Sequence, residues 1–173
     1  MSIPSLSTKV VPTDSLPREV AFLMDDIPDW EVLAASFGAA IEVIRIDATT
    51  DGLEQIAQWA DAHHGYETIR IFSHGSNGTL HLGRLTLQDG NIDEHAQALQ
   101  RIGTALVETG DILLYGCDVA QDSVGRLFVQ HLSQAMDADV AVSTNPTGSK
   151  ALGGDWMLEY QSGAIESSAF LFD

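Results

Sequence analysis

TIRIFSHG (residues 68–75) and DILLYGCD (residues 111–118) are the two stretches that decide the fold of this chain. Each is a run of strand-forming, mostly apolar residues that ends in small or polar ones. A continuous apolar run of this length indicates a strand buried on both faces, as in a parallel sheet covered by helices. The first run leads into His74 and the second into Cys117, so we expect a histidine and a thiol at the carboxyl ends of two strands.

Short apolar runs alternate with segments of helical periodicity along the rest of the chain. We predict six strands, at residues 19–26, 41–47, 68–73, 111–116, 139–144 and 155–160. The first predicted helix follows Asp29 as its N-cap, and three more cover residues 53–60, 92–108 and 122–135. The stretch TLHLGRLTL (79–87) predicts a β-hairpin that turns at residues 83–84. This order predicts an α/β fold, a three-layer α/β/α sandwich with a mostly parallel sheet of about six strands and a small β-hairpin after the third strand.

The composition limits the size of the protein and the partners it can bind. With 173 residues, 45% hydrophobic and 19% charged, the chain suits one folded domain, which we assign to residues 19–173. We expect residues 1–18, which contain three prolines, to form a flexible leader. The net charge of −17 argues against nucleic acid and anionic membrane surfaces as partners, because both need basic patches. We find no signal peptide and no apolar run of about 20 residues, so we predict no membrane insertion.

Polar side chains follow the predicted strands at one edge of the sheet. An open parallel sheet binds its ligands at this edge, outside the carboxyl ends of the strands. The residues are Asp25 and Asp26 after the first strand, His74 after the third, Cys117 after the fourth, and Ser143, Thr144 and Asn145 after the fifth. Adjacent strands lie about 5 Å apart. If the third and fourth strands are neighbours, His74 and Cys117 can therefore meet across one cleft.

A histidine beside a cysteine is a pairing that makes a thiol nucleophilic. A free thiol has a pKa near 8.5, so at neutral pH it needs a partner that accepts its proton. The helix predicted after Cys117 would also favour a thiolate through its positive amino end. Gly75 and Gly116 leave the backbone open to a substrate, and the amides of Gly75 and Cys117 could stabilise an oxyanion. The residues alone leave the alternatives open, because a lone cysteine is often a small core residue and a histidine after a strand is often part of a turn.

An apolar block that ends in Ser-His-Gly, followed by one that ends in Gly-Cys-Asp, resembles the cysteine peptidase clan of caspases, gingipains, legumains and separases. The stretches SHGSNGTLHLG, DILLYGCDVA and ALGGDWMLEY (73–83, 111–120 and 151–160) resemble a bacterial domain family found near the start of large secreted repeat proteins and calcium-binding adhesins. The resemblance implies a caspase-like fold in which a catalytic histidine follows the third strand and the nucleophilic cysteine follows the fourth.

Carried onto this chain, the resemblance makes Cys117 the nucleophile and His74 the general base, with Gly75 in the oxyanion hole. Tyr115 stands two residues before the cysteine, where several members of the clan carry an acidic residue or a glutamine that shapes the P1 pocket. Their preference for charged P1 side chains therefore does not transfer, and we expect a small or apolar P1 residue. We count Tyr115 among the substrate-binding residues.

The other polar groups at this edge have several possible roles. Ser143, Thr144 and Asn145 lie where the resemblance implies a substrate-binding loop, although ordinary loop residues would give the same pattern. Asp25 and Asp26 could orient His74, bind an activating Ca²⁺, or close the end of the sheet. The histidines show no regular spacing of metal ligands, so we predict no metal among the site residues and no further cofactor.

Together with these residues, the resemblance implies a cysteine endopeptidase that acts through a Cys117/His74 dyad and a thioester intermediate. Its partner would be a peptide substrate, or in cis the parent polypeptide to which the domain is attached. The alternative is a non-catalytic module that uses the same fold for binding, secretion or surface retention of a large repeat protein. The resemblance implies an extracellular or cell-surface location, with any secretion signal outside these residues.

Overall fold

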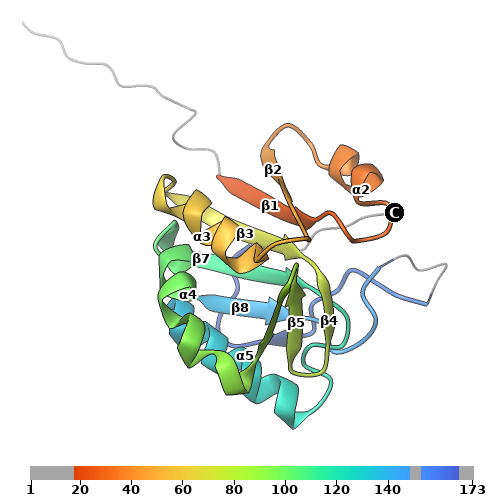
Figure 1. Cartoon of the computed structure of the whole chain (residues 1–173), viewed down its shortest axis with the longest axis vertical. Coiled ribbons are helices and arrows are strands. Elements are labelled where there is room, and N and C mark those ends of the chain that lie inside the picture. The colour runs from red at the N-terminus through yellow and green to blue at the C-terminus, as the bar shows by residue number, and fades with distance from the viewer. Residues whose placement is uncertain (1–17, 149–152, 168–173) are drawn as a thin grey trace, which may run out of the picture.

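A computed structural model describes residues 18–148 and 153–167 of the chain (Figure 1). The leader predicted for residues 1–18 lies, apart from Arg18, outside the described residues. No helix in the described part of the chain is long and apolar enough to cross a membrane. The structure confirms the predicted class, a mixed α/β fold with a mostly parallel six-stranded sheet flanked by helices.

The main sheet has the strand order β2-β1-β3-β7-β8-β9. Its strands are β1 (Glu19–Met24), β2 (Ile41–Ile46), β3 (Tyr66–Phe72), β7 (Leu106–Tyr115), β8 (Asp139–Val142) and β9 (Tyr160–Gln161). All neighbours pair in parallel except β8 and β9, which are antiparallel. The central strands β1, β3 and β7 are the apolar runs of the sequence, because a strand covered on both faces has no side chain in water.

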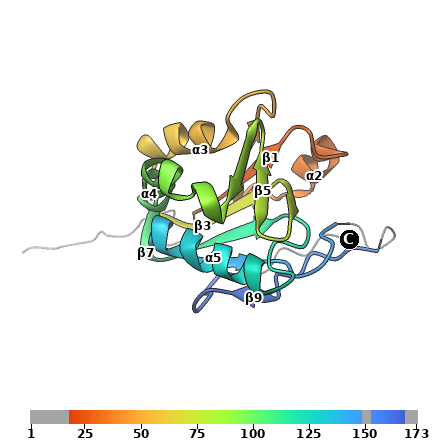
Figure 2. The same cartoon turned by 60° about the horizontal axis from the view of Figure 1, so that its bottom comes forward.

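The helices lie on both faces of this sheet because the chain reverses its direction across the sheet. It passes from β1 outward to β2 and then returns to the far side of β1 as β3. With right-handed crossovers, this reversal places α2 (Trp30–Ser36) on one face and α3 (Gly52–Asp61) on the other. The later crossovers add α4 (Ala96–Gly103) and α5 (Ser123–Met136) beside α3, and Figures 1 and 2 show α2 apart from these three helices.

Two hydrophobic clusters fill the space between the layers. The larger lies under α3, α4 and α5 and contains Phe22, Ile69, Ile112 and Phe128, all fully buried. The smaller lies on the α2 face, where Leu33 of α2 packs with Phe72 and Tyr115. Its remaining cover comes from the segment after β8, which adds Trp156, Leu158 and Ile165.

A small second sheet follows β3 directly (Figure 1). It consists of β4 (His74–Ser76), β5 (Thr79–Leu82) and β6 (Leu85–Gln88), paired antiparallel. The predicted hairpin is therefore confirmed, with its turn at Gly83, whose φ of 68° suits glycine. The sequence analysis did not predict β4, in which His74 pairs with His81. His74 is therefore the first residue of a strand.

Three predicted elements are wrong in their extent, and one of them is the strand predicted at 111–116, which already begins at Leu106 as β7. The helix predicted at 92–108 is confined to α4, preceded by the 3₁₀ turns η2 (Asp89–Asn91) and η3 (Asp93–His95). It ends at Gly103, where a Cβ would lie 1.9 Å from the carbonyl oxygen of Met136, and Leu106 already belongs to β7. The strand predicted at 155–160 is reduced to β9, because residues 156–158 cover the face of the sheet instead of extending it.

Candidate functional site

The strands that carry His74 and Cys117 are neighbours in the sheet. β3 and β7 pair in parallel up to Phe72 and Tyr115, and the amide of Ser73 donates to the carbonyl of Tyr115 at 3.2 Å. The segments that follow β3 and β7 therefore leave the sheet side by side. One carries His74 and the other carries Cys117. The order of the strands reverses direction between β1 and β3, and the carboxyl ends of these strands lie at the same edge. Open α/β sheets usually bind their ligands at such a point.

His74 is held by the loop that follows β1. Its side chain is 48% exposed, and its Nε2 lies 3.1 Å from the carbonyl oxygen of Asp26 and 3.9 Å from the Asp26 carboxylate. A carbonyl oxygen only accepts hydrogen bonds, so the bond assigns the hydrogen to Nε2. In the neutral imidazole Nδ1 then carries the lone pair. The arrangement prepares Nδ1 of His74 to accept a proton.

Cys117 lies on the wall of a cavity of about 460 Å³. Its sulfur accepts a hydrogen bond from the amide of Thr147 at 3.4 Å and lies 3.6 Å from the carbonyl oxygen of the same residue. The thiol is half-buried and belongs to neither hydrophobic cluster. Cys117 is therefore not a core residue, which was the alternative that the sequence left open.

The backbones beside His74 and Cys117 touch. A Cβ placed on Gly116 would lie 3.6 Å from Cα of Gly75, and one placed on Gly75 would lie 3.3 Å from the Cys117 carbonyl oxygen. No hydrogen bond joins the His74 ring to the Cys117 sulfur in residues 18–148 and 153–167, since the ring contacts Asp26 and the sulfur contacts Thr147. The structure thus brings the two segments together and leaves the two side chains with separate partners.

The amide of Cys117 is available as an oxyanion donor. It donates to no other described residue, whereas the next amide, that of Asp118, donates to the carbonyl of Asn145 at 3.0 Å. Asp118 adopts a left-handed conformation with φ of 57°, which turns the chain sharply after the cysteine. Gly75, the other predicted donor, lies in β4 opposite Leu80.

The walls of the cavity are mainly apolar. Ile27, Pro28, Val32 and Leu33 come from the α2 side, and Trp156 comes from the segment after β8. Asp29 also lines the cavity; it occupies the N-cap position of α2, as predicted, but its side chain makes no capping hydrogen bond.

Tyr115 does not line the cavity, contrary to its predicted role in substrate binding. It is 2% exposed and stacks on Phe72, with ring centroids 4.4 Å apart. Its ring also lies 6.3 Å from that of Trp156, at an angle of 55°. A side chain in a central strand points into a core when both faces of the sheet are covered. Tyr115 therefore packs in the smaller cluster, next to Trp156 of the cavity wall.

The predicted loop residues Ser143, Thr144 and Asn145 do not line the cavity but hold the loop that does. The Ser143 hydroxyl donates to the carbonyl of Asn145 at 2.6 Å, the Thr144 amide donates to the Glu159 carboxylate at 3.0 Å, and the Asn145 side chain donates to Asp155 at 3.0 Å. They hold the loop whose next residues line the cavity: Pro146, Thr147 and Gly148. The sequence analysis missed these three, although Pro and Gly in NPTG (145–148) indicate a turn.

The two acidic residues after β1 have different environments. The Asp25 carboxylate binds Arg45 at 2.7 Å and accepts from the amide of Ala48 at 2.9 Å, and the pKa of Asp25 is lowered, first by the Ala48 hydrogen bond and then by Arg45. Asp25 is therefore occupied within the β1–β2 edge, which leaves it a structural role. Asp26 contacts His74, mainly through its backbone carbonyl.

The amino end of α5 is less favourable to a thiolate than the sequence predicted. The helix begins at Ser123, after the turn of residues 118–122, and Asp122 caps it by accepting from the amide of Val124 at 2.9 Å. Asn77 of the β4–β5 turn donates to the same carboxylate at 2.7 Å, and this bond is the main cause of a lowered pKa of Asp122. The charge on Asp122 offsets the positive end of the helix, so this helix end contributes little to stabilising a thiolate.

One cluster of possible metal ligands lies elsewhere in the described residues. Asp111, Asp139 and Glu166 each place a carboxylate oxygen within 4.8 Å of the others, where the middle of β7 pairs with the first residue of β8. Sequence spacing did not reveal the cluster, because the pairing of two strands brings the aspartates together.

A family model described as a domain of unknown function, DUF4347, matches residues 20–173, and the chain belongs to this family. The matched residues include the main sheet from the second residue of β1 onward, together with His74 and Cys117. No curated protein matches the chain.

Proposed function

We propose that this member of the family is a cysteine endopeptidase of the caspase-like type, with Cys117 as nucleophile and His74 as general base. The observation that carries the proposal is the position of the only thiol in the sequence. It lines an apolar cavity of about 460 Å³ at the sheet edge where His74 also lies. Binding sites for small groups in proteins have volumes of about 300–1,000 Å³ and mostly apolar walls.

The proposed chemistry uses His74, Cys117 and the Cys117 amide. Nδ1 of His74 accepts the Cys117 proton, and the sulfur attacks the scissile carbonyl carbon to form a tetrahedral intermediate. The free amide of Cys117 donates to the developing oxyanion. The C–N bond then breaks, His74 returns the proton to the leaving amine, and a thioester remains. Water adds to the thioester, its proton passes through His74 to the sulfur, and the acid product leaves.

The position of His74 suits this role although its ring does not contact the sulfur. The bond from Nε2 to Asp26 fixes the tautomer with Nδ1 unprotonated, and the Asp26 carboxylate 3.9 Å away would stabilise the imidazolium. Catalytic hydrogen bonds are often long in unliganded enzymes and shorten when the substrate binds.

The cavity suits an apolar substrate side chain. Ile27, Leu33 and Trp156 form its walls, and the described lining contains no lysine or arginine that would pair with an acidic P1 residue. A charged side chain would lose its hydration there without a partner of opposite charge. We therefore propose a peptide substrate with an apolar P1 residue, supplied in trans or by the parent polypeptide in cis, at the cell surface or outside the cell.

A non-catalytic binding module is the second candidate. The observation that favours it is the contact of the thiol with Thr147 in place of His74. In this case the apolar cavity would hold a peptide side chain without cleavage of the peptide, and the domain would serve binding, secretion or surface retention of a larger protein.

Peptide cleavage distinguishes the two candidates. Purified protein is incubated with peptides that differ only at one position, occupied by Leu, Phe, Ala, Asp or Lys, and the products are identified by mass spectrometry. We expect cleavage after the apolar residues, its loss in Cys117→Ala, and a decrease of roughly 10²–10⁴-fold in His74→Ala.

His95→Ala is the matched control. His95 lies beside α4, and its side chain makes no hydrogen bond to a described residue, so cleavage by this variant should equal that of wild type. Cleavage that persists in Cys117→Ala would overturn the peptidase proposal. Peptide binding that is equal in wild type and Cys117→Ala, without any cleavage, would establish the binding module instead.

A further inference from the structure

A row of polar residues crosses four paired strands of the main sheet, level with the first residues of β1 and β8. Glu19 of β1 pairs with Thr68 of β3, Thr68 with Asp111 of β7, and Asp111 with Asp139 of β8. Residues that pair in register on parallel strands point to the same face of the sheet. The two aspartates are therefore direct neighbours, and like charges directly opposite each other repel.

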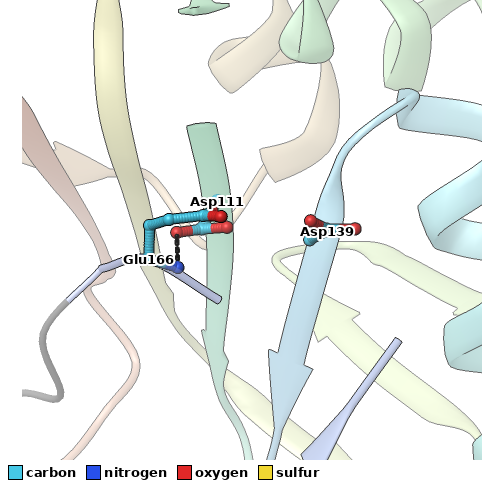
Figure 3. Close-up of side chains that lie close together, drawn as sticks. All are labelled: Asp111, Asp139 and Glu166. Atoms are coloured by element: carbon cyan, nitrogen blue, oxygen red, sulfur yellow. Dashed lines mark hydrogen bonds between the residues drawn. The ribbon is translucent and has the colours of Figure 1, made fainter. Parts of the chain in front are cut away.

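The chain after β9 passes over this row. Gly163 approaches the Asp139 carboxylate so closely that a Cβ on the glycine would lie 2.1 Å from Oδ1. Farther along, the amides of Glu166 and Ser167 donate to Oδ2 of Asp111 at 2.9 and 2.8 Å. This places the Glu166 side chain beside the two aspartates, as Figure 3 shows.

One oxygen of Asp111 has no partner in the described part of the chain. Asp111 is 0% exposed, and its Oδ2 accepts all three of its hydrogen bonds, two from the amides and one from the Ser167 hydroxyl. Oδ1 is buried and accepts none, and it lies on the side of Asp139 (Figure 3). A buried carboxylate oxygen without a donor is costly, and a cation is the partner that two more carboxylates beside it would share.

We propose that Asp111, Asp139 and Glu166 bind one Ca²⁺ ion at this point of the sheet. Their oxygens lie within 4.8 Å of one another, a span that one ion bridges at metal–oxygen distances of about 2.4 Å. Mg²⁺ binds at about 2.0–2.1 Å in a strict octahedron and would require the carboxylates to move closer together. Ligands that are all carboxylate oxygens also favour a hard cation over zinc.

The surroundings leave room for the ion and its water. A cavity of about 230 Å³ adjoins the cluster, and four of its lining residues are acidic: Glu19, Glu67, Asp111 and Glu166. Arg70, the cation two residues beyond Thr68 on β3, forms its ion pair with Glu19. The ion would join β7, β8 and the segment of residues 163–167, and so hold that segment against the sheet.

Calcium titration tests this proposal independently of any peptidase activity. The purified full chain is freed of metal with EDTA and titrated with CaCl₂ or MgCl₂ by calorimetry, and its Tm is measured with each salt. We expect one Ca²⁺ per chain with a Kd below about 10⁻³ M, binding of Mg²⁺ at least about tenfold weaker, and a Tm that rises with Ca²⁺.

Two variants and one control locate the site. Asp139→Asn and Glu166→Gln should each weaken Ca²⁺ binding about tenfold or more, and Glu94→Gln, an exposed acid on η3, should bind as wild type does. Glu166→Gln keeps the hydrogen bond from its backbone amide to Asp111. If Asp139→Asn fails to fold, Ca²⁺ binding by Glu166→Gln therefore still tests the site. No heat and no Tm change up to about 10 mM Ca²⁺, or equal binding by Glu166→Gln and wild type, would overturn the proposal. Equal affinity for Mg²⁺ would overturn the choice of ion.

Discussion

Gly75→Ala is expected to damage the site by separating the two segments that form it. The added Cβ would lie 2.9 Å from Cγ2 of Val119, 3.3 Å from the carbonyl oxygen of Cys117 and 3.3 Å from that of Thr79. Carbon atoms pack best at about 3.5–4.0 Å, so the methyl overlaps Val119 by roughly 0.6–1 Å. Two of the three neighbours are backbone atoms, and Val119 is fully buried, so none can move without displacing the turn that carries the thiol.

The expected magnitudes follow from these contacts. Overpacking of a tight interior position costs about 1–3 kcal/mol in the free energy of unfolding. The relief of the overlap moves β4 away from Cys117 by a fraction of an ångström to about 1 Å, and a misplacement of 1 Å can lower a catalytic rate about 10²-fold. We therefore expect Gly75→Ala to remain folded and to lose roughly 10–100-fold in thiol-dependent cleavage.

The assay combines urea unfolding with peptide cleavage, in a set of four proteins. Val119→Ala removes the methyl that the new Cβ meets first, at a cost of about 2 kcal/mol by itself. In the double variant Gly75→Ala/Val119→Ala the two effects should not add, and cleavage should recover in part relative to Gly75→Ala. Wild-type stability and wild-type cleavage in Gly75→Ala would refute the reasoning, as would fully additive losses in the double variant.

Three further predictions concern the support of the site. Asn77→Ala removes the bond from the β4–β5 turn to Asp122, so the Tm should fall by roughly 2–4 °C and the pKa of Asp122, followed by NMR, should rise toward its ordinary value. A backbone N–H and then Arg45 lower the pKa of Asp25, so its carboxylate stabilises the fold above its unfolded pKa of about 3.9 and loses that contribution as the pH falls through the lower folded value. The Tm difference between wild type and Asp25→Asn should therefore be present at neutral pH and close in acid, and a constant difference would contradict it. Trp156→Ala removes an apolar wall of the cavity, so KM for peptides with an apolar P1 residue should rise about tenfold or more while the rate with Cys117-directed alkylating agents stays unchanged.

The sequence allowed the prediction of the central strands and of the edge where the site lies. The runs that became β1, β3 and β7 are mostly apolar toward their carboxyl ends, because both faces of the sheet are covered there. The end of each run predicted that His74 and Cys117 lie at one edge of the sheet. The pairing of β3 with β7 confirmed that the two strands are neighbours.

The missed features depend on contacts between residues distant in the chain. Tyr115 is buried in the smaller cluster because Trp156 and α2 cover that face of the sheet. No residue near Tyr115 in the sequence indicates that this face is covered. The Asp26 carbonyl that holds His74 is a backbone atom, which leaves no trace in residue type. Asp111 and Asp139 appear unrelated until the register of β7 and β8 makes them neighbours.

The rate at which Cys117 reacts with iodoacetamide shows whether His74 activates the thiol. The rate is measured from acid to alkaline pH in wild type, His74→Ala and the control His95→Ala. The account predicts that wild type and His95→Ala react near neutral pH at least about tenfold faster than an unassisted thiol with a pKa of about 8.5, and that His74→Ala loses this excess. Identical pH profiles for wild type and His74→Ala, each resembling that of an unassisted thiol, would contradict the Cys117/His74 dyad.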